Sequence, residues 1–228
     1  MKRISVLFLV LILLFCMHSA TAASFDPHRA TAYMDIQFEC GCRRSGTGAM
    51  VGRYGLITCA HNLCCFEHCK WYKSITFVFG AKSASSGRKK VSSGFDAWAY
   101  DTFADGYKSE NDIGYVIFHK PVGDSTGWFA TQVASDRELD FTFVRVYHYN
   151  KGRYATIDQL MNVMSDQQCV IDSYPAGGDG APVAVVTSGD DYYTVTGVYT
   201  NHSSAGEGFV RRLTNKVFND MKSDGAFR

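Results

Sequence analysis

The sequence has no second long hydrophobic run, no marked excess of charge and no repeat. Beyond residue 15 no apolar stretch approaches the about 20 residues that a membrane-spanning helix needs, so the mature chain is expected not to enter a membrane. The formal net charge of +1 gives no reason to expect binding to nucleic acid or an acidic membrane surface. No low-complexity segment or linker is visible either, and residues 121–127 are the best candidate for a hinge between two halves.

The first 22 residues have the pattern of a secretory signal peptide. Lys2 and Arg3 precede an apolar run over residues 4–15, and Ala20-Thr21-Ala22 forms a small-x-small cleavage signature. The pattern predicts that residues 1–22 are removed and that residues 23–228 form a secreted protein in an oxidising compartment.

The rest of the chain is dominated by short strand patterns. Runs of aromatic and β-branched residues are separated by Gly, Ser, Asp and Asn, which predicts an all-β barrel or sandwich. Thr214 to Lys222 is predicted as a C-terminal helix behind a Thr N-cap, and Thr156 to Met164 is a second, brief helical candidate. The predicted strands cover residues 33–38, 74–79, 113–118, 141–149, 182–187 and 192–199.

Seven of the eight cysteines lie beyond the signal segment, and six of these fall between residues 40 and 69. In an oxidising compartment most are expected to pair as disulfides, with at least one left over. A zinc site is the alternative, because His61, Cys64, Cys65, His68 and Cys69 all offer ligands. Their spacing fits no regular zinc frame, so no metal and no cofactor are predicted.

Ser45 to Asn62 reads as a hairpin that presents His61 just past its second strand. Asp112 opens a later apolar strand, and a glycine-rich turn follows at residues 177–182. Nucleophilic acyl transfer needs a histidine base, a carboxylate that orients it, and a nucleophile on a turn whose N–H groups bind an oxyanion. The order of histidine, aspartate and turn is the order that this chemistry has in chymotrypsin.

Three motifs make the resemblance specific. ITCAHN resembles TAAHC, NDIGYVIF resembles the NDIAL motif, and GGDGAPV resembles GNSGSPV or GDSGGPV. The chain is similar to chymotrypsin-like serine proteases, and within them to secreted glutamyl endopeptidases. The resemblance implies two antiparallel six-stranded β-barrels, the first at about 30–122 and the second with a C-terminal helix at about 128–224.

The resemblance also assigns the catalytic residues. His61 is the base, Asp112 orients it, and Asp179 falls at the nucleophile position, where the family has serine. Gly177 and Asp179 would supply the oxyanion N–H groups. A second alignment deletes the serine altogether. A carboxylate cannot form the usual acyl-serine, and it is expected to raise the pKa of the histidine. Ser173 or Ser188 would substitute only if the turn were rearranged.

Ser173, Tyr199 and Thr200 are the candidate substrate-binding residues. Tyr199 occupies the place where glutamyl endopeptidases carry a histidine that helps to hold a substrate glutamate, so that preference is not inherited. A tyrosine packed inside the barrel is the equally good alternative.

Three hypotheses remain open. The first, which we favour, is a secreted protease homologue that lacks its nucleophile and acts as a monomer by binding a peptide or protein. The second is an active secreted endopeptidase with a nonstandard nucleophile or turn. The third is a cysteine-clustered metal-binding module on the same fold.

Overall fold

In the computed structural model, residues 25–81, 87, 89–100, 108–186 and 193–228 are described. The predicted signal peptide, residues 1–22, and the alternative nucleophile Ser188 lie outside these ranges. Within them, no helix is both long and apolar enough to cross a membrane.

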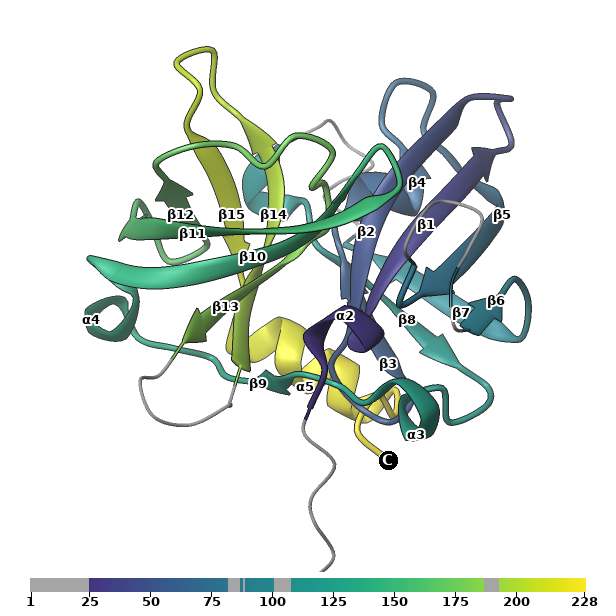
Figure 1. Cartoon of the computed structure of the whole chain (residues 1–228). Helices are drawn as coiled ribbons and strands as arrows, with labels where there is room; N and C mark the ends of the chain where they lie inside the picture. Colours follow the sequence, from purple (N-terminus) through teal and green to yellow (C-terminus); the bar gives the residue numbers. More distant parts are fainter. Residues whose placement is uncertain (1–24, 82–86, 88, 101–107, 187–192) are drawn as a thin grey trace, which may run out of the picture.

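The chain folds into two antiparallel β-barrels that lie side by side (Figure 1), which confirms the predicted fold class. In the first barrel six strands are paired in the order β5-β1-β2-β3-β8-β7, and two short strands, β4 and β6, extend from β5. The strands are β1 (Thr31–Phe38), β2 (Arg43–Met50), β3 (Gly55–Thr58), β4 (Cys64–Cys65), β5 (Lys70–Phe79), β6 (Lys89–Val91), β7 (Phe95–Ala99) and β8 (Gly114–Phe118).

The second barrel is a closed ring of six strands. Its order is β10-β11-β12-β15-β14, and pairing of β13 with both β10 and β14 closes the ring, while short β9 runs parallel to β14. The strands are β9 (Ala130–Thr131), β10 (Thr142–Asn150), β11 (Arg153–Val163), β12 (Gln168–Ile171), β13 (Pro182–Val186), β14 (Tyr193–His202) and β15 (Gly208–Arg212). The helical elements are α2 (Pro27–Ala30), η1 (Ala60–Asn62), η3 (Ser109–Asn111), α3 (Gly123–Thr126), α4 (Asp136–Leu139) and α5 (Asn215–Ser223).

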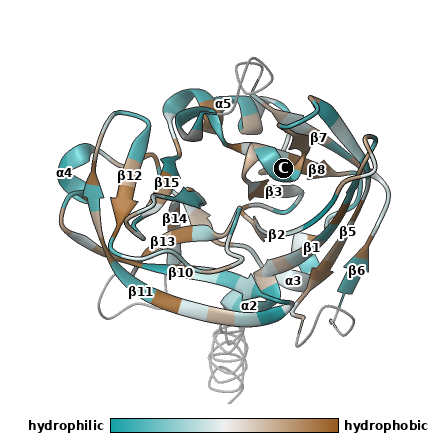
Figure 2. Cartoon of the chain, turned by 90° about the horizontal axis from the view of Figure 1, so that it is seen from above, coloured by the Kyte–Doolittle hydropathy of each residue, from teal (hydrophilic) through white to brown (hydrophobic). Residues whose placement is uncertain are grey.

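Alternating side chains of the strands fill each barrel. In the first barrel Phe77 and Phe118 meet edge to face with ring centroids 5.2 Å apart, a geometry that aromatic pairs prefer. In the second barrel Val146, Ile171 and Val183 are fully buried. Figure 2 shows hydrophobic residues on strands of both barrels, among them β5 and β12.

The helix predicted over Thr156 to Met164 is wrong, because these residues belong to β11 and to the residue that follows it. The β-branched residues Thr156 and Ile157 suit a strand, and Asp158 lies opposite Arg145 of β10. The Arg145 guanidinium donates to the Asp158 carboxylate at 2.8 Å. Cross-strand pairing over the whole length of β10 therefore prevails over a weak local helical pattern.

The predicted C-terminal helix is confirmed as α5, where the Thr214 hydroxyl accepts from the Val217 N–H. The helix and the residues after it pack against the first barrel. The Tyr115 hydroxyl of β8 donates to Asp224 at 2.6 Å, and the Ala226 carbonyl accepts from the N–H groups of Tyr54 and Gly55. The end of the chain thus returns from the second barrel to complete the first.

Met221→Ala is expected to destabilise the protein by about 2–5 kcal/mol, since it leaves a cavity where a fully buried side chain stood. Urea unfolding followed by fluorescence would measure the change. The control, Lys222→Ala at the exposed neighbouring position, should change stability by no more than about 0.5 kcal/mol. Equal effects of the two substitutions would contradict the packing of α5.

Candidate active site

His61 and Asp112 form a buried, doubly hydrogen-bonded pair. His61 lies in η1, directly after β3, and its side chain is 6 % exposed, while Asp112 precedes β8 and is inaccessible. The Asp112 carboxylate accepts from the His61 backbone N–H at 2.9 Å and lies 2.7 Å from Nδ1. Because β3 pairs with β8, the sheet itself brings the two residues together. The carboxylate therefore fixes the ring so that Nε2 points away from it.

The glycine-rich turn of the second barrel is held against the first barrel through its backbone. The Asp179 carbonyl accepts from the Thr47 N–H at 2.8 Å and from the Asn62 side-chain amide at 2.9 Å. On the other side, the Gly180 N–H donates to the Tyr199 carbonyl at 2.8 Å. These bonds place residue 179 beside His61.

The Asp179 carboxylate faces His61. Its Oδ2 atom lies 3.5 Å from His61 Nε2, and its side chain is 41 % exposed. The structure thus brings together all three residues that the sequence assigned to catalysis, with the Asp179 carboxylate facing Nε2 of His61.

Cys59 also contacts the ring, with its Sγ 3.5 Å from His61 Nε2. The sequence analysis left this residue out of the site. Its thiol is fully buried, and burial raises its pKa to about 12. A thiolate nucleophile needs a lowered pKa and access to substrate, so Cys59 meets neither requirement.

The pKa of His61 lies well above its ordinary value. Burial disfavours the imidazolium, but the charge of Asp112 and the hydrogen bonds to Asp112 and Asp179 outweigh that effect. The raised pKa agrees with the expected effect of a carboxylate at position 179.

The predicted oxyanion donors lie on the same turn. Gly177 has a φ of +75°, a left-handed conformation that glycine adopts readily. Among the residues that the structure describes, the N–H groups of Gly177 and Asp179 donate to no acceptor. Binding of an oxyanion by these two N–H groups stays a prediction.

The three predicted substrate-binding residues have other contacts. The Ser173 hydroxyl accepts from the Gln159 side chain at 2.9 Å, and the Thr200 hydroxyl donates to the Phe209 carbonyl at 3.3 Å. Tyr199 is 1 % exposed inside the second barrel, and its hydroxyl has no partner among the described residues. Burial raises the pKa of that hydroxyl. Substrate contact by these residues stays a prediction.

One group of possible metal ligands belongs to this site. Ligand atoms of Cys59, His61 and Asp112 lie within 4.8 Å of one another. Asp112, however, faces Nδ1 and Cys59 faces Nε2, which are on opposite sides of the imidazole. The three cannot all bind one ion through the ring as it is oriented.

Asn62 is a residue of the site that the sequence analysis did not single out. Its amide donates to both the Thr58 hydroxyl and the Asp179 carbonyl, and it therefore joins the two barrels. The signal was present in the motif itself, because ITCAHN ends in asparagine where TAAHC ends in cysteine.

Comparison with known structures identifies the fold as that of chymotrypsin-like serine proteases. A Glu endopeptidase has a TM-score of 0.72 and 13 % identity, with 91 % of this chain and 95 % of that chain covered. The protease Anisep from Arthrobacter nicotinovorans has a TM-score of 0.69, 13 % identity and coverage of 89 % and 98 %. A scabies mite inactivated protease paralogue has a TM-score of 0.61, 13 % identity and coverage of 88 % and 96 %. The sequence matches no protein-family model and no curated protein.

Gly180→Ala is expected to destabilise the protein by about 1–3 kcal/mol more than Gly206→Ala, because an added Cβ would overlap other atoms. Gly180 has a φ of +83°, and its Cβ would lie 2.2 Å from the Thr47 carbonyl oxygen. Gly206 has a φ of +92° and nothing within 4 Å of an added Cβ. Gly206→Ala therefore introduces the same kind of backbone strain as Gly180→Ala but no steric overlap. Chemical denaturation of both variants checks the difference, and equal losses would show that the turn is not docked on β2.

Asp179→Asn is expected to lower the pKa of His61, since it removes one of the groups that favour the imidazolium. Because the pKa of His61 is raised in the folded state, the imidazolium makes its full contribution to stability at pH values below the unfolded pKa of about 6.5. That contribution is lost as the pH rises through the folded pKa. NMR titration of the imidazole protons measures the shift. Asp96→Asn removes the carboxylate 2.9 Å from His119 and is the control, which should leave the pKa of His61 unchanged. An unchanged pKa of His61 in Asp179→Asn would contradict the contact between Asp179 and His61.

Proposed function

We propose that this chain is a secreted protease homologue without a working nucleophile, which binds a peptide or protein segment at the His61 site. The observation that carries the proposal is the Asp179 carboxylate at 3.5 Å from His61 Nε2. The protease fold supports peptide or protein as the ligand class.

A carboxylate at this position opposes acyl transfer in two ways. It pairs with the imidazolium and so keeps His61 from accepting a proton, and its negative charge lies next to the predicted oxyanion donors. Attack by the carboxylate itself would give a mixed anhydride in place of the acyl-serine. The intact His61–Asp112 pair then serves to hold the shape and charge of a binding site.

Secretion is part of the proposal and rests on the sequence of residues 1–22, which has a basic start, an apolar core and a small-residue cleavage signature. Amino-terminal sequencing of the protein recovered from culture medium tests it. A mature chain that begins after Ala22 agrees with the proposal, and a chain retained in the cell with residue 1 intact does not.

An active endopeptidase is the second candidate, and the contact of Cys59 with His61 is the observation that favours it. The sulfur is within reach of Nε2, but it is inaccessible and its pKa of about 12 keeps it protonated at neutral pH. A substrate would have to displace part of the barrel to reach it.

Asp179→Ser is expected to react with a fluorophosphonate probe and to hydrolyse casein, whereas the unmodified chain does neither. The substitution restores a hydroxyl beside a base that is already oriented by Asp112. Adding His61→Ala to Asp179→Ser should reduce hydrolysis by about 10⁴-fold or more. Gel detection of the probe and release of labelled casein fragments measure both activities.

Two further variants separate the candidates. If the unmodified chain cleaves casein and Cys59→Ala abolishes the cleavage, the protein is a cysteine-dependent endopeptidase and the first proposal is wrong. Thr126→Ser, a change away from the site, is the matched control for expression and folding and should behave as the unmodified chain does.

A further inference from the structure

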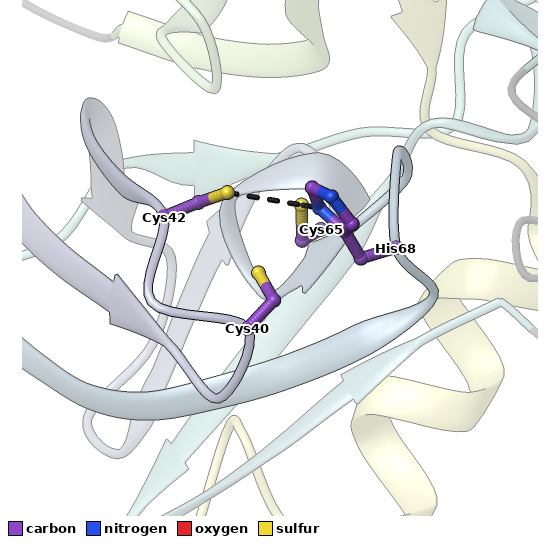
Figure 3. A group of neighbouring side chains, drawn as sticks. All are labelled: Cys40, Cys42, Cys65 and His68. Atoms are coloured by element: carbon purple, nitrogen blue, oxygen red, sulfur yellow. Dashed lines mark hydrogen bonds between the residues drawn. The ribbon is translucent and has the colours of Figure 1, made fainter.

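A second cluster of reactive side chains lies outside the His61 site. Cys40 and Cys42 come from the turn between β1 and β2, and Cys65 and His68 come from β4 and the loop before β5. One ligand atom from each of the four lies within 4.8 Å of the others. Figure 3 shows the three sulfurs and the imidazole ring directed toward one another from these two hairpins.

The distances fit one tetrahedral ion. His68 Nδ1 lies 3.6 Å from Cys42 Sγ and 3.5 Å from Cys65 Sγ. Zinc binds sulfur at about 2.3 Å and imidazole nitrogen at about 2.0–2.1 Å, so a tetrahedral site separates sulfur from nitrogen by about 3.6 Å. A single nitrogen that faces two thiols at this spacing is the arrangement of a metal ligand.

The backbone holds the cysteine pair in place. The Phe38 N–H donates to the Cys42 carbonyl at 2.9 Å, and the Gly41 N–H donates to the Phe38 carbonyl at 3.0 Å. Gly41 has a φ of +88°, which glycine adopts without penalty. The tight turn lets two residues separated by a single glycine present their sulfurs to the same point.

We propose that Cys40, Cys42, Cys65 and His68 bind one zinc ion in a tetrahedral site of three thiolates and one imidazole. Binding deprotonates the three thiols and releases their protons to solvent, while His68 keeps its proton on Nε2 and binds through Nδ1. A disulfide would use only two of the sulfurs and leave the third beside the histidine, whereas one zinc ion uses all four ligands.

The site ties the β1–β2 hairpin to the loop that follows the histidine. Phe66 lies between Cys65 and His68 in sequence, and its ring meets the His61 ring edge to face with centroids 6.3 Å apart. Zinc would therefore hold Phe66 against His61. The inference does not depend on whether the His61 site cleaves a peptide.

The test begins with the full mature chain, purified without chelator, reduced and then freed of the reductant. Titration with zinc chloride, with metal content measured by mass spectrometry, should give one tightly bound zinc per chain. Alkylation of the denatured apoprotein should modify Cys40, Cys42 and Cys65. If the reduced chain takes up no zinc, or if two of these cysteines re-form a disulfide in the presence of zinc, the proposal is wrong.

Variants locate the ion. His68→Gln should weaken zinc binding by about 100-fold or more, because even changes to groups behind the ligands cost about 10–100-fold. His119→Gln, at another exposed histidine, should bind zinc as the unmodified chain does. Cys69→Ser should also bind normally, since Cys69 is outside the four-residue cluster.

Cobalt provides a spectroscopic check that reports the geometry and the ligand atoms of the bound ion. The cobalt-loaded protein should show the visible bands of a tetrahedral ion and the near-ultraviolet band of thiolate ligands, and Cys40→Ser should reduce the thiolate band. A cobalt spectrum unchanged by both Cys40→Ser and His68→Gln would place the ion elsewhere and overturn the assignment.

Discussion

The Asp179 carbonyl is the point on which the arrangement of the site depends. It accepts one hydrogen bond from the backbone of β2 and one from the Asn62 amide, and both donors belong to the first barrel. Buried backbone carbonyls are almost always paired, and here the pairing joins the two barrels, which also share buried residues in one hydrophobic cluster. The side chain of residue 179 is thereby carried to His61 whatever its chemistry.

Because this turn is held through its backbone, the geometry of the site does not depend on which side chain residue 179 carries. The positions of His61, Asp112 and the turn depend on main-chain bonds and on the pairing of β3 with β8, none of which requires a serine. An aspartate can therefore occupy the apex while the surrounding fold stays unchanged. The likeness to a Glu endopeptidase and to an inactivated protease paralogue is a likeness of fold, and fold alone does not determine activity.

The sequence predicted much of this because its strongest signals are local or ordered along the chain. The β2–β3 hairpin, the Thr214 cap of α5 and the order of His61, Asp112 and the glycine-rich turn were all readable. The β11 strand was missed because its local pattern is weak and its backbone pairing with β10 decides its conformation. The sequence named Cys65 and His68 as possible metal ligands but not Cys40 and Cys42, because these two reach His68 only through the β1–β5 pairing, which no sequence spacing expresses.

The return of residues 224–226 to the first barrel also affects how the protein folds. The Ala226 carbonyl bonds to Tyr54 and Gly55, which means that the turn between β2 and β3 finds its partner beyond the second barrel in sequence. Loop closure over such a length is entropically unfavourable, and contacts distant in sequence form slowly. The first barrel is therefore expected to reach its final form only when residues that follow the second barrel in sequence have docked against the turn at residues 52–55.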